Sequence, residues 1–353
     1  MKKLLSLLLL LSTVFTLFGC FDNPSGENGE ARMHKISSYY FNTLSVIYTY
    51  GEEDDATIEK YTSIADEVLS YYHELFDIYF EYADVNNIKT INKNAGRNPV
   101  KVDKALIDFL KYCKEIYTLT GGRTNVMLGS VLSIWHDKRE SAMDDFGYLS
   151  VDELPTSDEL SEAARHTSID LLVIDEEEST VYISDPKASL DVGAVAKGYA
   201  VDILYERLAA EGADSVALNI GGNLRTIGLK PDGSDWVTGI TNPDKEADVS
   251  LKCRIEIDET SVVTSGDYER YFTAGDKRYH HIIDPETLMP AEYFSSVTII
   301  TEKSGLADAL STALFCMSYE DGLALAGEVE GVEVIWIYAD GEMKYTDGVK
   351  MAE

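Results

Sequence analysis

Residues 189–202, which read SLDVGAVAKGYAVD, decide how the rest of this chain is interpreted. The stretch leaves an apolar run and turns at Gly193. It then continues with apolar residues at helical spacing, which are Val195, Tyr199, Ile203, Leu204 and Leu208. The pattern therefore predicts a strand, a tight glycine turn and the N-terminus of a helix.

Such a junction can bind an anion, because backbone N–H groups and the positive end of the helix dipole are exposed there. Lys197 adds a formal positive charge close to the turn. A phosphate-bearing ligand is one interpretation, and an ordinary strand-to-helix turn with a solvated lysine is the other. The spacing matches neither the P-loop nor the glycine fingerprint of dinucleotide-binding folds.

The N-terminal segment has the features of an export signal. Lys2 and Lys3 precede an uncharged run over residues 4–18, which is followed by Gly19 and Cys20. A basic start, a short apolar segment and a small residue before a cysteine are typical of a bacterial lipoprotein signal. We predict a signal peptide over residues 1–19 and lipidation of Cys20. A plain secretory signal or a retained membrane anchor is the alternative.

This interpretation sets the domain organisation and the location of the protein. Residues 20–35 are polar, contain Gly and Pro, and are predicted to be a flexible tether. Residues 36–353 are predicted to form the folded domain. The domain is expected outside the cytoplasm, anchored by lipid to the cell membrane.

The chain is strongly acidic, with 62 Asp and Glu against 30 Lys and Arg and a formal net charge of -32. This charge disfavours nucleic acid and anionic lipid surfaces as partners. It also repels phosphate, so a phosphate ligand in this protein would need a metal cation.

Strand and helix patterns both occur along the chain. Strands are predicted over residues 38–51, 171–174, 181–183, 189–192, 215–220, 236–240 and 253–257, and helices over residues 56–80, 103–120 and 306–315. A hairpin turn is predicted at Gly275 and Asp276. Residues 136–158 are rich in charge and are predicted to be a surface excursion.

The cysteines beyond Cys20 are Cys113, Cys253 and Cys316. Their odd number and wide spacing predict free thiols, and they indicate neither a zinc site nor a disulfide framework.

Two further features have a structural and a functional interpretation. His280 and His281 are adjacent, and the chain has six histidines in all. Side chains alternate along a strand, so at most one of this pair points into a site, and either could be structural. The Gly221-Gly222 pair follows a short apolar strand and fits a structural turn or a binding loop equally well.

Residues 306–315 form an apolar helix that carries Asp308 and Thr312 four residues apart, hence on one face. A buried carboxylate without a partner is costly, and the helix itself contains no Lys or Arg. A magnesium ion would resolve this, because it prefers carboxylate, hydroxyl and carbonyl oxygens together with substrate phosphates. The alternative is an aspartate bonded to backbone N–H groups or to a lysine from elsewhere.

Taken in series, these motifs resemble the FAD:protein FMN transferases of the ApbE family. The matching stretches are residues 191–202, 219–223, 264–271, 281–285 and 307–313. They occur in the family's order, and the resemblance covers roughly residues 40–339. The resemblance implies a mixed α/β fold related to the T-fold. It also implies a magnesium-dependent transfer of FMN from FAD to a threonine hydroxyl of another protein, with release of AMP.

The resemblance assigns roles to individual residues. Asp308 and Thr312 would hold magnesium together with the carbonyl of Ala194. FAD contacts are implied for Asp191, Lys197, His281, Phe41 and Tyr82. Where the family usually has Ala-Phe-Asp, this chain has Arg123, Thr124 and Asn125, which would line the flavin pocket without an aromatic wall. Ser311 stands where some members have a second metal-binding aspartate, and Asn42 replaces a glycine beside Phe41.

The implied reaction is an in-line displacement at the phosphorus next to riboflavin. His281 or Asp284 is the candidate to accept the proton of the attacking hydroxyl. The acceptors would be flavoproteins, and we expect them to belong to membrane electron-transport systems. Two alternatives stay open at this stage. One is an FAD pyrophosphatase that gives FMN and AMP, and the other is a non-catalytic flavin-binding lipoprotein.

Overall fold

The computed structural model describes residues 32–51 and 54–352. The predicted signal peptide and Cys20 lie outside this part. The predicted tether is too long at its C-terminal end, because β1 (Arg32–Tyr40) already pairs with β2 (Thr43–Gly51) from Arg32 onward. Residues 32–35 therefore belong to the folded domain.

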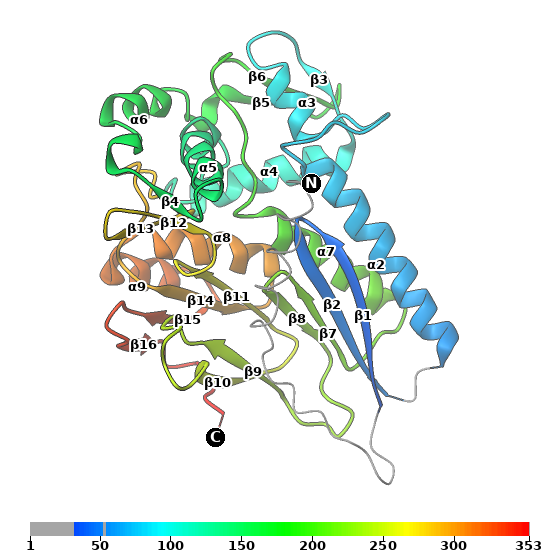
Figure 1. The fold of residues 1–353 in the computed structure, drawn as a ribbon. Coiled ribbons are helices and arrows are strands. Elements are labelled where there is room, and N and C mark those ends of the chain that lie inside the picture. The colour runs from blue at the N-terminus through cyan, green and yellow to red at the C-terminus, as the bar shows by residue number, and fades with distance from the viewer. Residues whose placement is uncertain (1–31, 52–53, 353) are drawn as a thin grey trace.

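The described residues are built around an eight-stranded sheet whose neighbouring strands are all antiparallel (Figure 1). Its order is β1, β2, β7 (Val216–Ile220), β8 (Asn223–Ile227), β11 (Ser261–Gly266), β14 (Ser296–Thr301), β15 (Glu333–Ile337) and β16 (Met343–Tyr345). Successive side chains point to opposite faces of a strand, so the sheet needs a cover on both sides. Ile47 packs in the core on one face, and its neighbours Val46 and Tyr48 pack in the core on the other.

Helices cover one face of the sheet and a hairpin covers the other. The helices are α2 (Asp55–Phe76), α7 (Ala196–Ala210) and α8 (Ser304–Phe315), whose apolar sides form the two largest cores with the strands. The hairpin consists of β9 (Trp236–Thr241) and β10 (Leu251–Ile257). The sheet is thus the middle layer of the domain.

The remaining elements surround this core. They are α3 (Ile88–Lys93), β3 (Val100–Lys101), α4 (Lys104–Leu119), α5 (Gly129–Met143), β4 (Tyr148–Leu149), α6 (Ser157–Ala164), β5 (Leu172–Asp175), β6 (Thr180–Ile183), β12 (Tyr271–Ala274), β13 (Lys277–His280) and α9 (Tyr319–Glu328), with two short 3₁₀ turns at Val151–Glu153 and Ile169–Leu171. Figure 1 shows α5 and α6 above β12 and β13, where they enclose a separate small core. None of the helices in the described ranges combines the length and the apolar character needed to span a membrane.

Most predicted elements are present, and the mixed α/β fold is confirmed. The predicted helices over residues 103–120 and 306–315 correspond to α4 and α8, and the predicted hairpin at Gly275 joins β12 to β13. The cysteines predicted to be free, Cys113, Cys253 and Cys316, are free thiols.

Three element predictions are wrong. Residues 38–51 form two strands, because Phe41 and Asn42 both adopt left-handed backbone angles and make a tight turn. Residues 189–192 are extended but join no sheet, since the side-chain amide of Asn92 makes both backbone hydrogen bonds of Leu190. Part of the predicted surface excursion over 136–158 continues helix α5 to Met143.

Helices α7 and α8 approach each other closely at a glycine. At Gly198 a side chain would collide with α8, because a Cβ there would lie 2.3 Å from the carbonyl oxygen of Ser304 and 2.7 Å from the Cβ of Asp308. Asp202, one turn further along α7, accepts hydrogen bonds from the N–H groups of Ser304 and Gly305 at 2.8 and 2.9 Å. A residue of α7 thus caps the N-terminus of α8.

We expect Gly198→Ala to lower the free energy of unfolding by about 1–3 kcal/mol, because the added methyl group must push α8 away from α7. Gly327→Ala is the matched control. Gly327 is an exposed residue of α9, and a Cβ added to it would meet no heavy atom within 4 Å, so alanine should raise stability there by up to about 1 kcal/mol. Urea unfolding measures both changes. Equal effects of the two substitutions would contradict the close contact.

Candidate active site

A large cavity of about 1270 Å³ lies at one end of the sheet. Its wall includes the β1–β2 turn, the C-terminal end of α2, residues from the segments 123–140 and 189–197, the β7–β8 turn, the end of β11 and part of α8. Small-molecule sites in proteins usually occupy about 300–1,000 Å³. This cavity is therefore large enough for an extended ligand such as a dinucleotide.

Asp308 lies at the base of this cavity and is only 5% exposed. Its carboxylate has two kinds of partner. The backbone N–H of Gly198 donates to Oδ2 at 3.0 Å, and the Lys197 ammonium lies 3.4 Å from both carboxylate oxygens. The alternative raised from the sequence, a backbone N–H or a lysine from elsewhere, therefore describes the side chain in this structure.

The carbonyl of Ala194 lies at the same end of α7. Ala194 precedes the helix, because Val195 is the N-cap and α7 begins at Ala196. The N–H of Gly198 is therefore one of the free donors of the helix N-terminus, and Asp308 accepts from it. Ala194 lines the cavity, and within the described ranges its carbonyl accepts no hydrogen bond.

Thr312 completes a set of oxygen donors that fits magnesium. It lines the cavity one turn after Asp308, and its hydroxyl lies 3.5 Å from the carbonyl oxygen of Asp308. The described ranges contain no cluster of three or more His, Cys, Asp or Glu side chains. A metal here would thus rely on one carboxylate, one carbonyl, one hydroxyl and oxygens from a ligand, which is a combination that magnesium accepts.

The two adjacent histidines have different surroundings. His280 is buried, and both of its ring nitrogens face backbone groups, the carbonyl of Ala291 at 2.8 Å and the N–H of Ile282 at 3.2 Å. Among the described residues, Nδ1 of His281 is buried without a hydrogen-bond partner. Burial, reinforced by the nearby Arg270, holds the pKa of His281 well below its ordinary value. His281 is therefore a neutral imidazole able to accept a proton.

Asp284 and Tyr82 do not line the cavity, contrary to prediction. Asp284 is buried, pairs with Arg123 at 3.2 Å and accepts from the N–H of Glu286. The hydroxyl of Tyr82 donates to Asp77 at 2.7 Å, and Asp77, not Tyr82, lies at the cavity wall. Of the two residues predicted as the proton acceptor, His281 is the one that lines the cavity.

Arg123, Thr124 and Asn125 all line the cavity, as predicted, but each is engaged in bonds that hold the wall together. Arg123 donates to the carbonyl of Cys316 at 2.9 Å, and Thr124 donates to the carbonyl of Ala309 at 2.7 Å. These bonds attach the end of α4 to α8.

The amide of Asn125 has a similar role. It donates to the carbonyl of Thr167 at 2.9 Å and accepts from the N–H of Met127 at the same distance. The segment thus fixes the shape of the cavity and leaves few free polar groups for a ligand.

The predicted contacts Phe41 and Asp191 also lie at the cavity. Phe41 sits in the left-handed β1–β2 turn with its ring edge-on to His73 at 5.7 Å. The β7–β8 turn faces it, because a Cβ on Gly221 would lie 2.4 Å from the side chain of Thr43. Gly221 and Gly222 are therefore both a structural turn and part of the ligand wall.

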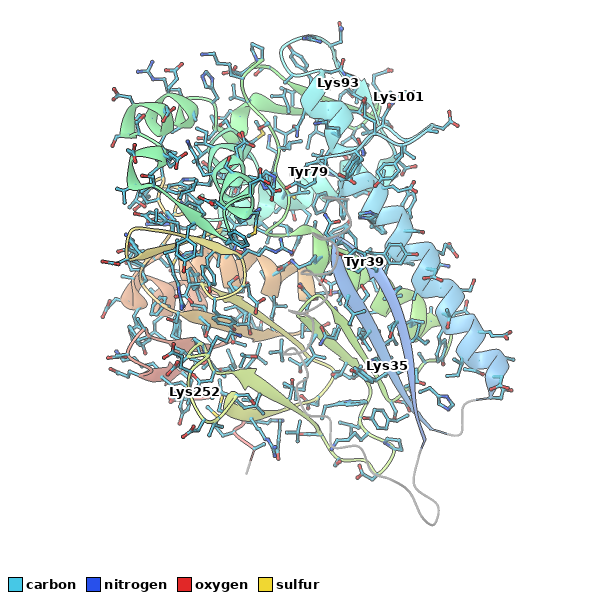
Figure 2. All side chains as sticks on the ribbon, viewed as in Figure 1. Lys35, Tyr39, Tyr79, Lys93, Lys101 and Lys252 are labelled. Carbon is cyan, nitrogen blue, oxygen red and sulfur yellow. The ribbon has the colours of Figure 1, made fainter. Side chains whose placement is uncertain are left out.

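Sequence reasoning missed a further group of residues at the cavity, namely Tyr79, His136, Arg139 and Arg270. The rings of Tyr79 and His136 lie 5.4 Å apart, and Arg139 donates to Nδ1 of His136 at 2.8 Å. In the view of Figure 2, Tyr79 lies above Tyr39, which marks the end of the β1–β2 hairpin. Helical spacing of His136 and Arg139 was the available signal, but their charge suggested a solvent-exposed segment.

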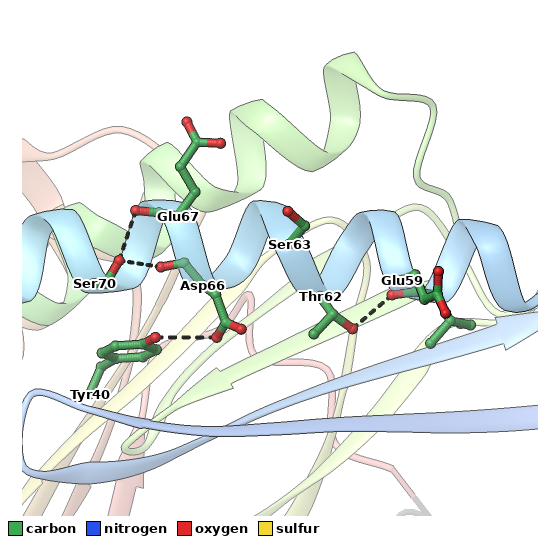
Figure 3. Close-up of a pocket in the computed structure, with 8 residues that line it drawn as sticks. Tyr40, Glu59, Thr62, Ser63, Asp66, Glu67 and Ser70 are labelled. Carbon is green, nitrogen blue, oxygen red and sulfur yellow. Dashed lines mark hydrogen bonds between the residues drawn. The ribbon is translucent and has the colours of Figure 1, made fainter.

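A second, more open pocket of about 720 Å³ lies between α2 and Tyr40 of β1 (Figure 3). Its charged lining residues are all acidic, Glu59, Asp66 and Glu67. Asp66 accepts a hydrogen bond from the hydroxyl of Tyr40 at 3.3 Å. A negative wall of this kind disfavours phosphate, so the large cavity is the candidate active site.

The fold and the large cavity together define a mixed α/β protein with oxygen donors, a lysine and a neutral histidine in one site. Comparison with known proteins identifies the family. The ApbE family model matches residues 42–336, and the chain belongs to the ApbE family.

Relatives and solved structures agree over most of the chain. A FAD:protein FMN transferase of Treponema pallidum is 29% identical over 94% of this chain and 91% of its own, and one of Klebsiella pneumoniae is 30% identical over 71% and 75%. The ApbE protein of Thermotoga maritima matches with a TM-score of 0.76 and 26% identity, covering 90% of this chain and 97% of its own. The flavin transferase ApbE of Vibrio cholerae matches with a TM-score of 0.73 and 26% identity, covering 91% and 97%. The predicted family, fold class and transferase activity are confirmed.

We expect the imidazole of His281 to be neutral at pH 6, because burial and adjacent cations disfavour its charged form. Its signals in an NMR titration, assigned by their loss in His281→Gln, should titrate below pH 6.5. Titration at or above pH 6.5 would contradict the environment described here.

The same shift has a consequence for stability. The unfolded chain takes up a proton near pH 6.5 that the folded chain does not, so acidification below pH 6.5 should favour unfolding. Relative to His281→Gln, the protein should lose up to about 1.4 kcal/mol per pH unit in this range. At pH 8 the difference between the two proteins should no longer depend on pH.

Proposed function

We propose that this protein is a magnesium-dependent FAD:protein FMN transferase. In this proposal it attaches FMN through a phosphoester bond to a threonine of target flavoproteins and releases AMP. The observation that carries the proposal is the shared position of Asp308, Thr312 and the donor-free carbonyl of Ala194 at one cavity. Lys197 and the neutral His281 line the same cavity. The names of the relatives, FAD:protein FMN transferase, support the substrate.

The chemistry follows from the groups at the cavity. A bound magnesium ion would neutralise pyrophosphate oxygens and make AMP a better leaving group. The threonine oxygen forms a bond to the phosphorus next to riboflavin, and the bond from that phosphorus to the AMP oxygen breaks. His281 accepts the hydroxyl proton at a ring nitrogen, and AMP leaves with the electron pair of the broken bond. The cavity walls position the two reactants.

We also propose that the protein works outside the cytoplasm, tethered to the cell membrane by a lipid on Cys20. The support is the signal-like sequence before Cys20 and the short distance along the chain from Cys20 to Arg32, where β1 begins. A short tether keeps the cavity near the membrane, so acceptors associated with that membrane are the expected targets.

Incubation of the protein with FAD, magnesium and a flavin-acceptor domain tests the transfer reaction. Intact mass spectrometry of the acceptor should show the addition of one FMN less water. Asp308→Asn should reduce the rate by at least about a hundredfold, because it removes the anionic metal ligand. The asparagine oxygen can still accept from Gly198, so the fold should be retained, and thermal unfolding checks this.

The matched control is Glu320→Gln, which removes a carboxylate charge from an exposed position of α9. Its transfer rate should equal that of the unmodified protein. If free FMN and AMP appear while the mass of a competent acceptor stays unchanged, the reaction is FAD hydrolysis and the transfer proposal is wrong. If FAD stays intact under all conditions, the protein binds flavin without catalysing a reaction.

Thr312 provides a separate test of the metal set. Thr312→Val removes the hydroxyl at nearly constant volume, and Thr312→Ser keeps it. We expect valine to raise the magnesium concentration for half-maximal rate by about tenfold or more. Serine should leave that concentration nearly unchanged. The same response in both variants would exclude the Thr312 hydroxyl as a ligand.

A further inference from the structure

Two arginines from different elements line the cavity that also holds Asp308. Arg139 belongs to α5, and Arg270 precedes β12. In residues 32–51 and 54–352 neither guanidinium forms an ion pair, and Arg139 bonds only to the ring of His136. Asp137, Glu140, Asp191 and Glu269 line the same cavity but form an ion pair with neither arginine. Burial raises the pKa of Asp191, and the charges of both arginines are among the effects that oppose this rise. Two unpaired cations in the cavity of so acidic a protein are a feature that an anionic ligand would explain.

The two guanidinium groups influence one another and the same neighbours. Burial and the charge of Arg270 lower the pKa of Arg139. Arg270 and Arg139 also contribute to the lowered pKa of His281, after the larger effect of burial. Both arginines therefore face the region occupied by His281.

The positive charge beside Asp308 is already balanced by the Asp308 carboxylate. Lys197 lies 3.4 Å from both oxygens of Asp308, so the charges of this pair largely cancel. A pyrophosphate diester carries one negative charge on each of its two phosphates, and a single metal beside this neutral pair would contact only some of the phosphate oxygens. Arginine is suited to the remainder, because its planar group binds phosphate oxygens in a bidentate manner.

We propose that Arg139 and Arg270 form a second anion subsite, which binds a phosphate group of the nucleotide substrate away from the Asp308 and Thr312 set. The identity of the nucleotide rests on the proposed function. The phosphate belongs to the AMP half or to the FMN half of the substrate. The chemistry of the subsite is the same in both cases.

Binding of mononucleotides to the whole protein tests this subsite. Isothermal titration calorimetry in the absence of metal compares AMP with adenosine and FMN with riboflavin. Arg139→Gln and Arg270→Gln should each weaken the binding of AMP or FMN by about tenfold or more. The affinity for the matching phosphate-free nucleoside should stay constant. The nucleotide that responds identifies which half the subsite holds.

Lys138→Gln is the matched control, since Lys138 is the preceding cation of α5 but does not line the cavity. It should leave all four affinities unchanged, and thermal unfolding should show that every variant is folded. The proposal is overturned if both arginine variants bind AMP and FMN as the unmodified protein does, or if adenosine and riboflavin lose affinity equally. Because this readout involves no acceptor and no turnover, its failure is distinguishable from failure of the transferase proposal, which the acceptor mass reports.

Discussion

The hydrogen bond from Gly198 to Asp308 is the contact on which the candidate site depends. It joins α7 to α8, and it exists because residue 198 has no side chain to separate the two helices. The same bond holds the Asp308 carboxylate at the cavity, beside the N-terminus of α7. Asp202 reinforces the arrangement one turn later by capping α8. Packing and chemistry are thus set by one helix pair.

The net charge of the chain does not describe the distribution of charge at the cavity. A net charge of -32 repels phosphate at a distance, yet Lys197, Arg123, Arg139 and Arg270 line the cavity beside six Asp and Glu side chains. Interactions within a partly enclosed site are screened less than those across the surface. The expectation that phosphate binding would need a metal rested on the net charge alone and did not consider these local cations.

Periodicity and local motifs predicted the helix carrying Asp308 and the glycine turn beside Lys197, and the family resemblance supplied the mixed fold and further residues at the cavity. They could not predict which way a side chain faces when tertiary contacts decide it. Asp284 and Tyr82 are close in sequence to lining residues, but Arg123 and Asp77 hold them elsewhere. The turn at Phe41 was missed because no glycine marked its left-handed residues. Segment 189–192 has a strand pattern, yet both backbone hydrogen bonds of Leu190 go to the side chain of Asn92 in α3.

Two polar groups without hydrogen-bond partners belong to residues at the cavity. A buried polar atom that lacks a hydrogen bond costs about 1–3 kcal/mol. Nδ1 of His281 is such an atom, and the carbonyl of Ala194 accepts no hydrogen bond within the described ranges. Both belong to residues at the same cavity. A purely structural cavity would gain stability by satisfying these groups internally, whereas a ligand site keeps them available for the substrate.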